Sequence, residues 1–198
     1  MRDRVTELVG ESGSRVWVST FHSSCARILR SDIEALGWTR RFAIYDDDDQ
    51  LRLLKDIVAR EGYDGDRVMA KKIRSQIDHH KNRMVDVDDL IKTRRTHVND
   101  PLVRVWQQYE QALRSADAID FNDLIGLVVK LFTQHPEIRD KWRERFQYVL
   151  VDEYQDTNRA QYRMLRALAD QHRNLAVCLL YTSPSPRDAT LSRMPSSA

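Results

Sequence analysis

The stretch Val149-Leu-Val-Asp-Glu-Tyr-Gln-Asp-Thr157 decides the fold of this chain. Its apolar start, residues 148–151, predicts a central strand of a parallel sheet that is covered on both faces. Such a strand presents Asp152 at its carboxyl end, which is where open α/β sheets bind their ligands. The stretch therefore predicts an α/β fold with a polar ligand site at this edge of the sheet.

An apolar strand that ends in Asp-Glu is the Walker B arrangement of phosphate-cleaving motors. We expect Asp152 to hold Mg²⁺, directly or through water, with Glu153 as a second candidate ligand. Glu153 is also expected to orient or deprotonate the attacking water, and Gln155 to hydrogen-bond the terminal phosphate of ATP. The alternative is an exposed acidic turn after a buried strand. The complete string over residues 152–157 favours the catalytic interpretation.

Composition restricts the class of protein. The chain has 198 residues, of which 41% are hydrophobic and 31% charged, so it can form one or two small domains with a core. Its net charge of +2 does not by itself indicate nucleic acid. No apolar run approaches the roughly 18 residues of a membrane span, and no signal peptide is evident. Two cysteines predict neither a disulfide framework nor a metal site. We expect a cytoplasmic protein with no membrane partner.

Hydrophobic spacing predicts a mostly helical chain with short strands. Strands are expected over residues 16–19 and 42–45, in addition to 148–151. Helices are expected over residues 21–36, 46–58, 68–95, 102–115, 121–133 and 159–170. Four consecutive aspartates at residues 46–49 suit the first turn of a helix. Pro101 lies in a turn that starts the next helix, and Pro136 marks a further boundary.

The last residues, 178–198, differ from the rest of the chain. They hold Pro184, Pro186 and Pro195 with many serines, a composition typical of a disordered tail. Codons that encode residues 178–188 can also spell a transposase-type sequencing-library adapter, and residues 192–198 match its continuation. We therefore expect the natural sequence to stop near Val177. A nucleotide read with other codons would refute this hypothesis.

Further motifs sit in a fixed order along the chain. The string Asp152-Glu-Tyr-Gln-Asp-Thr157 resembles motif II of the UvrD/PcrA/Rep helicases of superfamily 1. Ser19-Thr-Phe-His-Ser23 resembles their motif Ib, and residues 118–124 resemble the Asp-Phe-x-Asp-Leu segment before motif II. Residues 1–5 are similar to the end of motif Ia. The likeness covers residues 1–177, and Asn122, often an acidic position in the family, is a mild departure.

The resemblance implies a fragment of an ATP-dependent DNA helicase that moves 3′ to 5′ on single strands and unwinds duplexes. It implies Mg²⁺ and ATP as cofactors, and single-stranded and duplex DNA as partners. It also implies a role in DNA repair or replication, with repair or replication proteins as further partners. The implied fold is a partial RecA-like P-loop NTPase domain, 1A, from residues 1–45 and 118–177. Residues 46–117 are then the helical insertion 1B.

Candidate DNA contacts follow from the same resemblance. Thr20, Phe21 and His22 match positions near single-stranded DNA, where a hydroxyl or imidazole can bond phosphate and an aromatic ring can stack on a base. Phe21 is as well explained as a core residue. In the basic segment of the insertion we select Lys71, Lys72 and Arg74, although a solvated charged face is the competing interpretation because aspartates interleave with the cations. For Asp120 and Asp123 we expect structural support.

The phosphate-cradling loop of a complete motor is not in this sequence. None of its six glycines lies in a Gly-x-x-x-x-Gly-Lys pattern. We expect that loop upstream of Met1, and motif III and a second motor domain beyond Val177, so that this chain alone neither hydrolyses ATP nor unwinds DNA. Two alternatives stay open: a non-catalytic DNA-binding module, and the motor part of a RecB/AddA-type helicase–nuclease.

Overall fold

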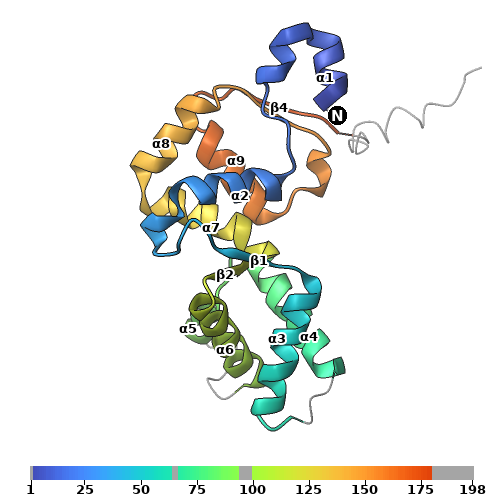
Figure 1. Ribbon diagram of the computed structural model, residues 1–198. Coiled ribbons are helices and arrows are strands. Elements are labelled where there is room, and N and C mark those ends of the chain that lie inside the picture. The colour runs from blue at the N-terminus through green and yellow to red at the C-terminus, as the bar shows by residue number, and fades with distance from the viewer. Residues whose placement is uncertain (1, 64–66, 94–99, 180–198) are drawn as a thin grey trace, which may run out of the picture.

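A computed structural model describes residues 2–63, 67–93 and 100–179, and the described residues form two lobes (Figure 1). The upper lobe contains α1 (Arg2–Val9), η1 (Gly10–Arg15), α2 (Phe21–Asp32), η2 (Ile33–Leu36), α7 (Phe121–Gln134), α8 (Pro136–Arg145), η3 (Tyr154–Asp156) and α9 (Arg159–Ala169). The lower lobe contains α3 (Asp47–Arg60), α4 (Arg67–Asn82), α5 (Val87–Lys92) and α6 (Pro101–Ser115).

Short parallel strand pairs complete the α/β fold. In the described chain, β1 (Ala43–Tyr45) pairs with β2 (Ala118–Asp120), with Ala43 opposite Ala118. Likewise β3 (Val149–Val151) pairs with β4 (Leu175–Val177). The lower-lobe helices lie between β1 and β2 in sequence, so the chain enters and leaves that lobe through adjacent strands (Figure 1). The mostly helical α/β expectation is confirmed.

Each lobe buries its own apolar cluster. Helical spacing on α2 and α7 puts Ile28, Leu29 and Phe132 into the upper core, where they are at most 1% exposed. The lower core is built around Trp106 and Tyr109 of α6, against apolar residues of α3 and α4. Because burial of such side chains is the main favourable term in folding, each lobe has its own source of stability.

Helix starts follow the predicted chemistry. The Asp46 carboxylate accepts hydrogen bonds at 2.9 Å from the amides of Asp48 and Asp49, which otherwise lack partners at a helix start. Asp100 caps α6 in the same way, with Pro101 as its first helical residue. Asp120 caps α7 and forms a reciprocal capping box with Asp123.

Two predicted elements are wrong. Residues 16–19 are not a strand, because no strand of the described chain lies beside them, and Trp17 instead packs its ring under the Arg27 guanidinium at 3.9 Å. The helix expected over residues 68–95 is broken between α4 and α5, where Met84 adopts a left-handed conformation with φ 59°. Asp86 then caps α5, and residues 94–99 lie outside the described residues.

The prediction that the strand at residues 148–151 is covered on both faces is also wrong. Val151 is buried, but the adjacent Leu150 is 77% exposed. Successive side chains of a strand point to opposite faces, so only one face of β3 is covered here. The strand pairs with β4 in the described chain, and residues 180–198, with most of the predicted tail, lie outside it.

Within the described residues, none of the helices combines the length and the apolar character that a membrane span needs.

Candidate functional site

A tight turn follows β3 and presents the two predicted acidic residues. The Cys178 amide donates to the Val151 carbonyl at 2.8 Å, and the Tyr154 amide donates to the Cys178 carbonyl at 3.0 Å. These two bonds tie both ends of the turn to the residue that follows β4. Asp152 and Glu153 are thereby held at the carboxyl end of the parallel pair, where both are exposed.

Glu153 has an unusual backbone for its residue type. Its φ of 51° and ψ of 42° are left-handed, and its amide donates to Asp152 Oδ1 at 3.0 Å. A non-glycine residue in this region costs about 1 kcal/mol or more and persists where the surroundings enforce it, as at functional sites. The strained backbone of the turn therefore sets the direction in which the Glu153 side chain leaves the main chain.

The donor set of this turn fits Mg²⁺. Carboxylate oxygens are the ligands that this cation prefers, and it is usually held by one or two carboxylates together with phosphate oxygens and water. Asp152 and Glu153 supply two exposed carboxylates, and the described residues contain no cluster of three or more metal-ligating side chains. Gln155 is exposed beside them, with its Nε2 donating to Asp156 Oδ2 at 3.4 Å. Additional ligands for a cation would thus have to come from a nucleotide and solvent.

The predicted DNA-contacting residues lie at the start of α2. Thr20 caps that helix by accepting from the Ser23 amide at 3.3 Å, and its side chain is exposed. Phe21 packs partly against the upper core. Burial lowers the pKa of His22, which favours a neutral imidazole. The His22 ring lies 5.2 Å from that of Phe121, an aromatic residue that is 44% exposed.

Phe121 was missed as a separate candidate. Its signal in the sequence is an aromatic residue directly after the helix cap Asp120, a position that projects from the first turn of α7. The structure brings it from the segment before motif II to the motif Ib helix. An exposed aromatic ring beside an imidazole is a suitable surface for stacking on a base.

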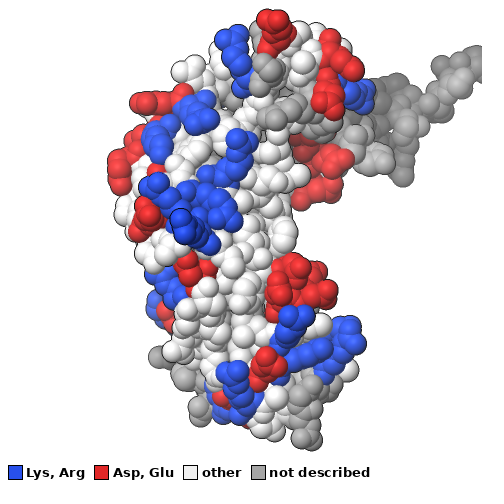
Figure 2. Space-filling model, in the orientation of Figure 1, with Lys and Arg blue, Asp and Glu red and all other residues white. Residues whose placement is uncertain are grey.

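The three basic residues selected on α4 differ from one another in their contacts. Lys71 and Lys72 are exposed. Arg74 is partly buried and donates to the Asp47 carbonyl at 3.0 Å, with ion pairs to the carboxylates of Asp47 and Asp78 at 3.6 and 3.9 Å. Its charge is therefore balanced within the chain. Figure 2 shows other cations gathered over α2 and α8 of the upper lobe, and acidic side chains at the start of α3.

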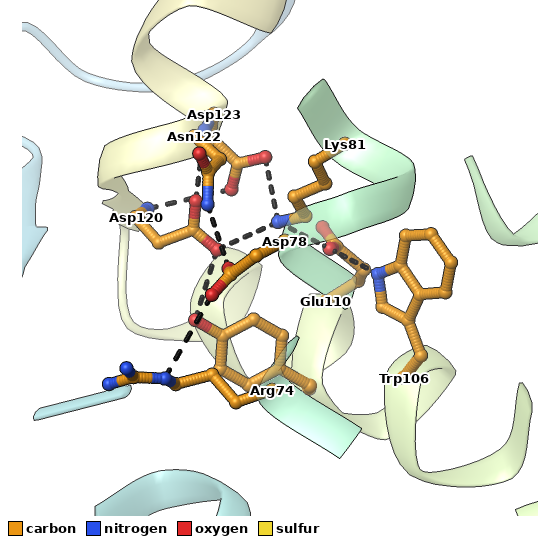
Figure 3. A network of polar contacts seen from close by, with 9 residues as sticks. Arg74, Asp78, Lys81, Trp106, Glu110, Asp120, Asn122 and Asp123 are labelled. Carbon is orange, nitrogen blue, oxygen red and sulfur yellow. Dashed lines mark hydrogen bonds and ion pairs between the residues drawn. The ribbon is translucent and has the colours of Figure 1, made fainter. Parts of the chain in front are cut away.

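A polar network joins the two lobes around Lys81 (Figure 3). The Lys81 ammonium of α4 lies 2.8 Å from each of three carboxylates, those of Glu110, Asp120 and Asp123. The Tyr109 hydroxyl also donates to Asp120 at 3.0 Å. The Lys81 and Asp120 side chains are 9% and 0% exposed, so the centre of this network is shielded from water, whereas Glu110 at its edge is 39% exposed.

The network extends to both sides. Trp106 donates its indole N–H to Glu110 at 2.8 Å, and the Asn122 amide donates to Asp78 at 2.7 Å. Arg74 lies on the other side of Asp78 (Figure 3). Asn122, where the family often has an acidic residue, is thus matched to Asp78. Its amide can donate to the Asp78 carboxylate, whereas the carboxylate of an acidic residue would repel it.

Burial and mutual charge decide the protonation of this cluster. Burial disfavours the charge on Lys81, but Asp123, Asp120 and Glu110 outweigh it and raise its pKa well above the ordinary value. Burial likewise opposes the ionisation of Asp120, yet the Lys81 charge and its hydrogen bonds lower the pKa of Asp120. For Asp123, burial prevails over Lys81, and with the charges of Asp120 and Glu110 it raises the pKa to about 8. One lysine thus faces one firmly ionised aspartate and one that retains a proton near neutral pH.

The sequence matches known helicases along nearly its whole described length. The sequence model of the UvrD/REP helicase N-terminal domain matches residues 1–179. The chain belongs to the UvrD helicase family. This UvrD-family chain is 37% identical over 177 residues to the ATP-dependent DNA helicase PcrA of Bacillus subtilis, and 38% identical to that of Staphylococcus epidermidis.

These matches confirm the family predicted from the motifs. Each covers 89% of this chain but 24% of the relative, so the UvrD-family chain spans about a quarter of the length of these helicases. The polar turn after β3 lies within the matched region.

Proposed function

We propose that this chain is part of an ATP-dependent DNA helicase and supplies the magnesium-binding and water-activating half of its ATPase site. One observation carries the proposal. Asp152 and Glu153 lie together in an exposed turn at the carboxyl end of the parallel strand β3, in a chain of the UvrD family. Ligand sites of α/β sheets form at this edge.

Each side chain of the turn has a proposed role. Asp152 would hold Mg²⁺, whose charge would neutralise that of the phosphates. Glu153 would orient the attacking water and accept its proton, and Gln155 would donate a hydrogen bond to the terminal phosphate. All three side chains are exposed, so a nucleotide could reach them.

The domain organisation is part of the proposal. Residues 1–45 and 118–177 would form part of motor domain 1A, and residues 46–117 the insertion 1B. The separate apolar cores of the two lobes support this division, as does the pairing of β1 with β2 on either side of the insertion.

DNA contact is proposed at two places. Thr20, Phe21 and His22 would meet a single strand at the start of α2, where the exposed Phe121 ring adds a stacking surface. On α4, Lys71 and Lys72 would contact phosphates. Arg74 would contribute less, because it already pairs with Asp47 and Asp78. Translocation from 3′ to 5′ and a role in repair or replication complete the proposal.

A chimera tests the ATPase assignment. Residues 1–177 of this chain would replace the matching segment of the Bacillus subtilis helicase, and DNA-stimulated ATP hydrolysis would be measured. We expect hydrolysis that Glu153→Gln lowers by about 10² or more, because it removes the general base, while Glu137→Gln, at an exposed glutamate of α8, leaves it unchanged. Substrates with a 3′ or a 5′ single-stranded tail would test the polarity.

A folded chimera that binds DNA but hydrolyses no ATP would instead favour a non-catalytic DNA-binding module. The unfused chain is expected to be inactive in the same assay. Magnesium-dependent hydrolysis by the unfused chain, abolished by Glu153→Gln, would refute that expectation.

A further inference from the structure

A polar pocket lies where the lower lobe meets the start of α9. It has a volume of about 550 Å³ and is lined by His79, Asn82, Arg83, Asn158 and Arg159. The first three come from the end of α4 and the residue after it, and the other two from the start of α9. Neither lobe could form this pocket alone.

The two walls of the pocket are joined by a hydrogen bond. The side-chain amide of Asn158 donates from Nδ2 to Asn82 Oδ1 at 2.9 Å. Asn158 also caps α9. Its Oδ1 accepts from the backbone amide of Gln161 at 2.9 Å, and the Gln161 side chain accepts from the backbone amide of Asn158. Hydrogen bonds to Asn82 and to Gln161 thus hold Asn158 on both sides.

The charge of the pocket is positive and unbalanced. Arg83 and Arg159 are exposed, and neither guanidinium group has a hydrogen bond or ion pair with any described residue. Arg74 and Arg166, by contrast, are paired with carboxylates. His79 adds an imidazole ring, and the start of α9 adds the partial positive charge of a helix N-terminus.

We propose that this pocket binds a backbone phosphate of a nucleic-acid strand. A guanidinium group can donate two parallel hydrogen bonds to phosphate oxygens. The N-terminus of a helix also favours anions. All five lining side chains are polar, whereas a site for a nucleotide base has mostly apolar walls. The ligand is therefore a strand that presents its phosphates, rather than free ATP. This inference rests on the proposed DNA-binding function and adds to it a contact shared by both lobes.

Fluorescence anisotropy of a labelled oligo-dT with the 198-residue chain tests the inference. Arg83→Gln and Arg159→Gln should each weaken binding about tenfold at low salt, as expected for a lost hydrogen bond to a charged group. Each should also reduce the slope of log affinity against log salt by about 0.7, the value for one phosphate contact on a single strand. Arg83→Lys, which keeps the charge, should retain most of the affinity.

Arg60→Gln is the matched control. Arg60 is an exposed arginine at the C-terminal end of α3. Its guanidinium group makes no hydrogen bond or ion pair with the described residues. Its substitution should change neither affinity nor salt slope. Circular dichroism and thermal unfolding would verify that all variants fold as the wild type does.

The possible outcomes separate this inference from the proposed function. Wild-type binding that both pocket variants retain with an unchanged salt slope would overturn the inference alone. A wild-type chain that binds no oligonucleotide would overturn both the pocket inference and the DNA contacts proposed for this chain. ATP binding that is lost in the pocket variants, with oligonucleotide binding intact, would overturn the assignment to a strand.

Discussion

Two aspartates lie at the carboxyl ends of strands in two parallel pairs and differ in their surroundings. Asp120 ends β2 and is completely buried, accepting from Lys81, Tyr109 and the Asp123 amide. Asp152 follows β3 and is exposed, and the Glu153 amide donates to it. A carboxylate whose bonding capacity is already filled supports the fold, whereas one left open to solvent can meet a ligand. Position at a strand end does not distinguish these roles; hydrogen-bond satisfaction does.

Replacing the cation of the buried cluster should have the largest effect. Lys81→Met leaves the carboxylates of Glu110, Asp120 and Asp123 without their shared partner. Removal of one member of a buried ion pair costs about 3–5 kcal/mol, and we expect that loss in the free energy of unfolding. Urea unfolding followed by circular dichroism would measure it. A loss below about 1 kcal/mol would mean that the cluster is less buried or less coupled than its geometry indicates.

The second effect is on the pH dependence of stability. The pKa of Asp123 is about 8 in the folded chain, above its ordinary 3.8, so the folded state holds a proton that the unfolded state releases between these values. Its contribution is complete below pH 4 and is lost as pH rises to 8. Because the side chain keeps 19% exposure, we expect a loss on the order of 2 kcal/mol, and Asp123→Asn should remove this dependence.

Unfolding curves from pH 4 to 8 would provide the measurement. Asp56→Asn is the control, since Asp56 is an exposed aspartate on α3. If the wild type and Asp123→Asn lose stability in parallel over this range, Asp123 ionises normally in the folded chain.

The smallest effect is expected at the exposed turn. Asp152→Asn should change the free energy of unfolding by no more than about 0.5 kcal/mol, as is usual for surface substitutions. The same urea titration as for Lys81→Met gives the comparison directly. A loss as large as that of Lys81→Met would show that Asp152 supports the fold and would weaken its assignment as a ligand.

Local signals made much of the fold predictable. Capping aspartates such as Asp46 and Asp100, and the apolar spacing around Ile28, act over a few residues, and the helices they mark form as expected. All four strands have three residues and depend on a distant partner, but an aromatic residue, Phe42 or Tyr148, precedes β1 or β3 and marks a β-prone run, which β2 and β4 lack. The same dependence explains why residues 16–19 are not a strand.

The candidate site divides in the same way. Asp152, Glu153 and Gln155 are adjacent in sequence, so their motif could be recognised without a structure. Lys81 was one cation among many in a basic run, and its partners come from other elements of the chain. The phosphate pocket depends on the bond between Asn82 and Asn158, which are 76 residues apart. No local pattern predicts a contact at that separation.

The parallel pairing of β1 with β2 has a consequence for how the lower lobe can be redesigned. The chain leaves the sheet after Tyr45, at the carboxyl end of β1, and must return to Ala118 at the opposite end of the adjacent strand. Parallel neighbours always need a crossover of about a dozen residues or more. The whole lower lobe is therefore an enlarged crossover connection. A redesigned connection needs at least the length of one crossover helix, and a tight two-residue turn cannot replace the lobe.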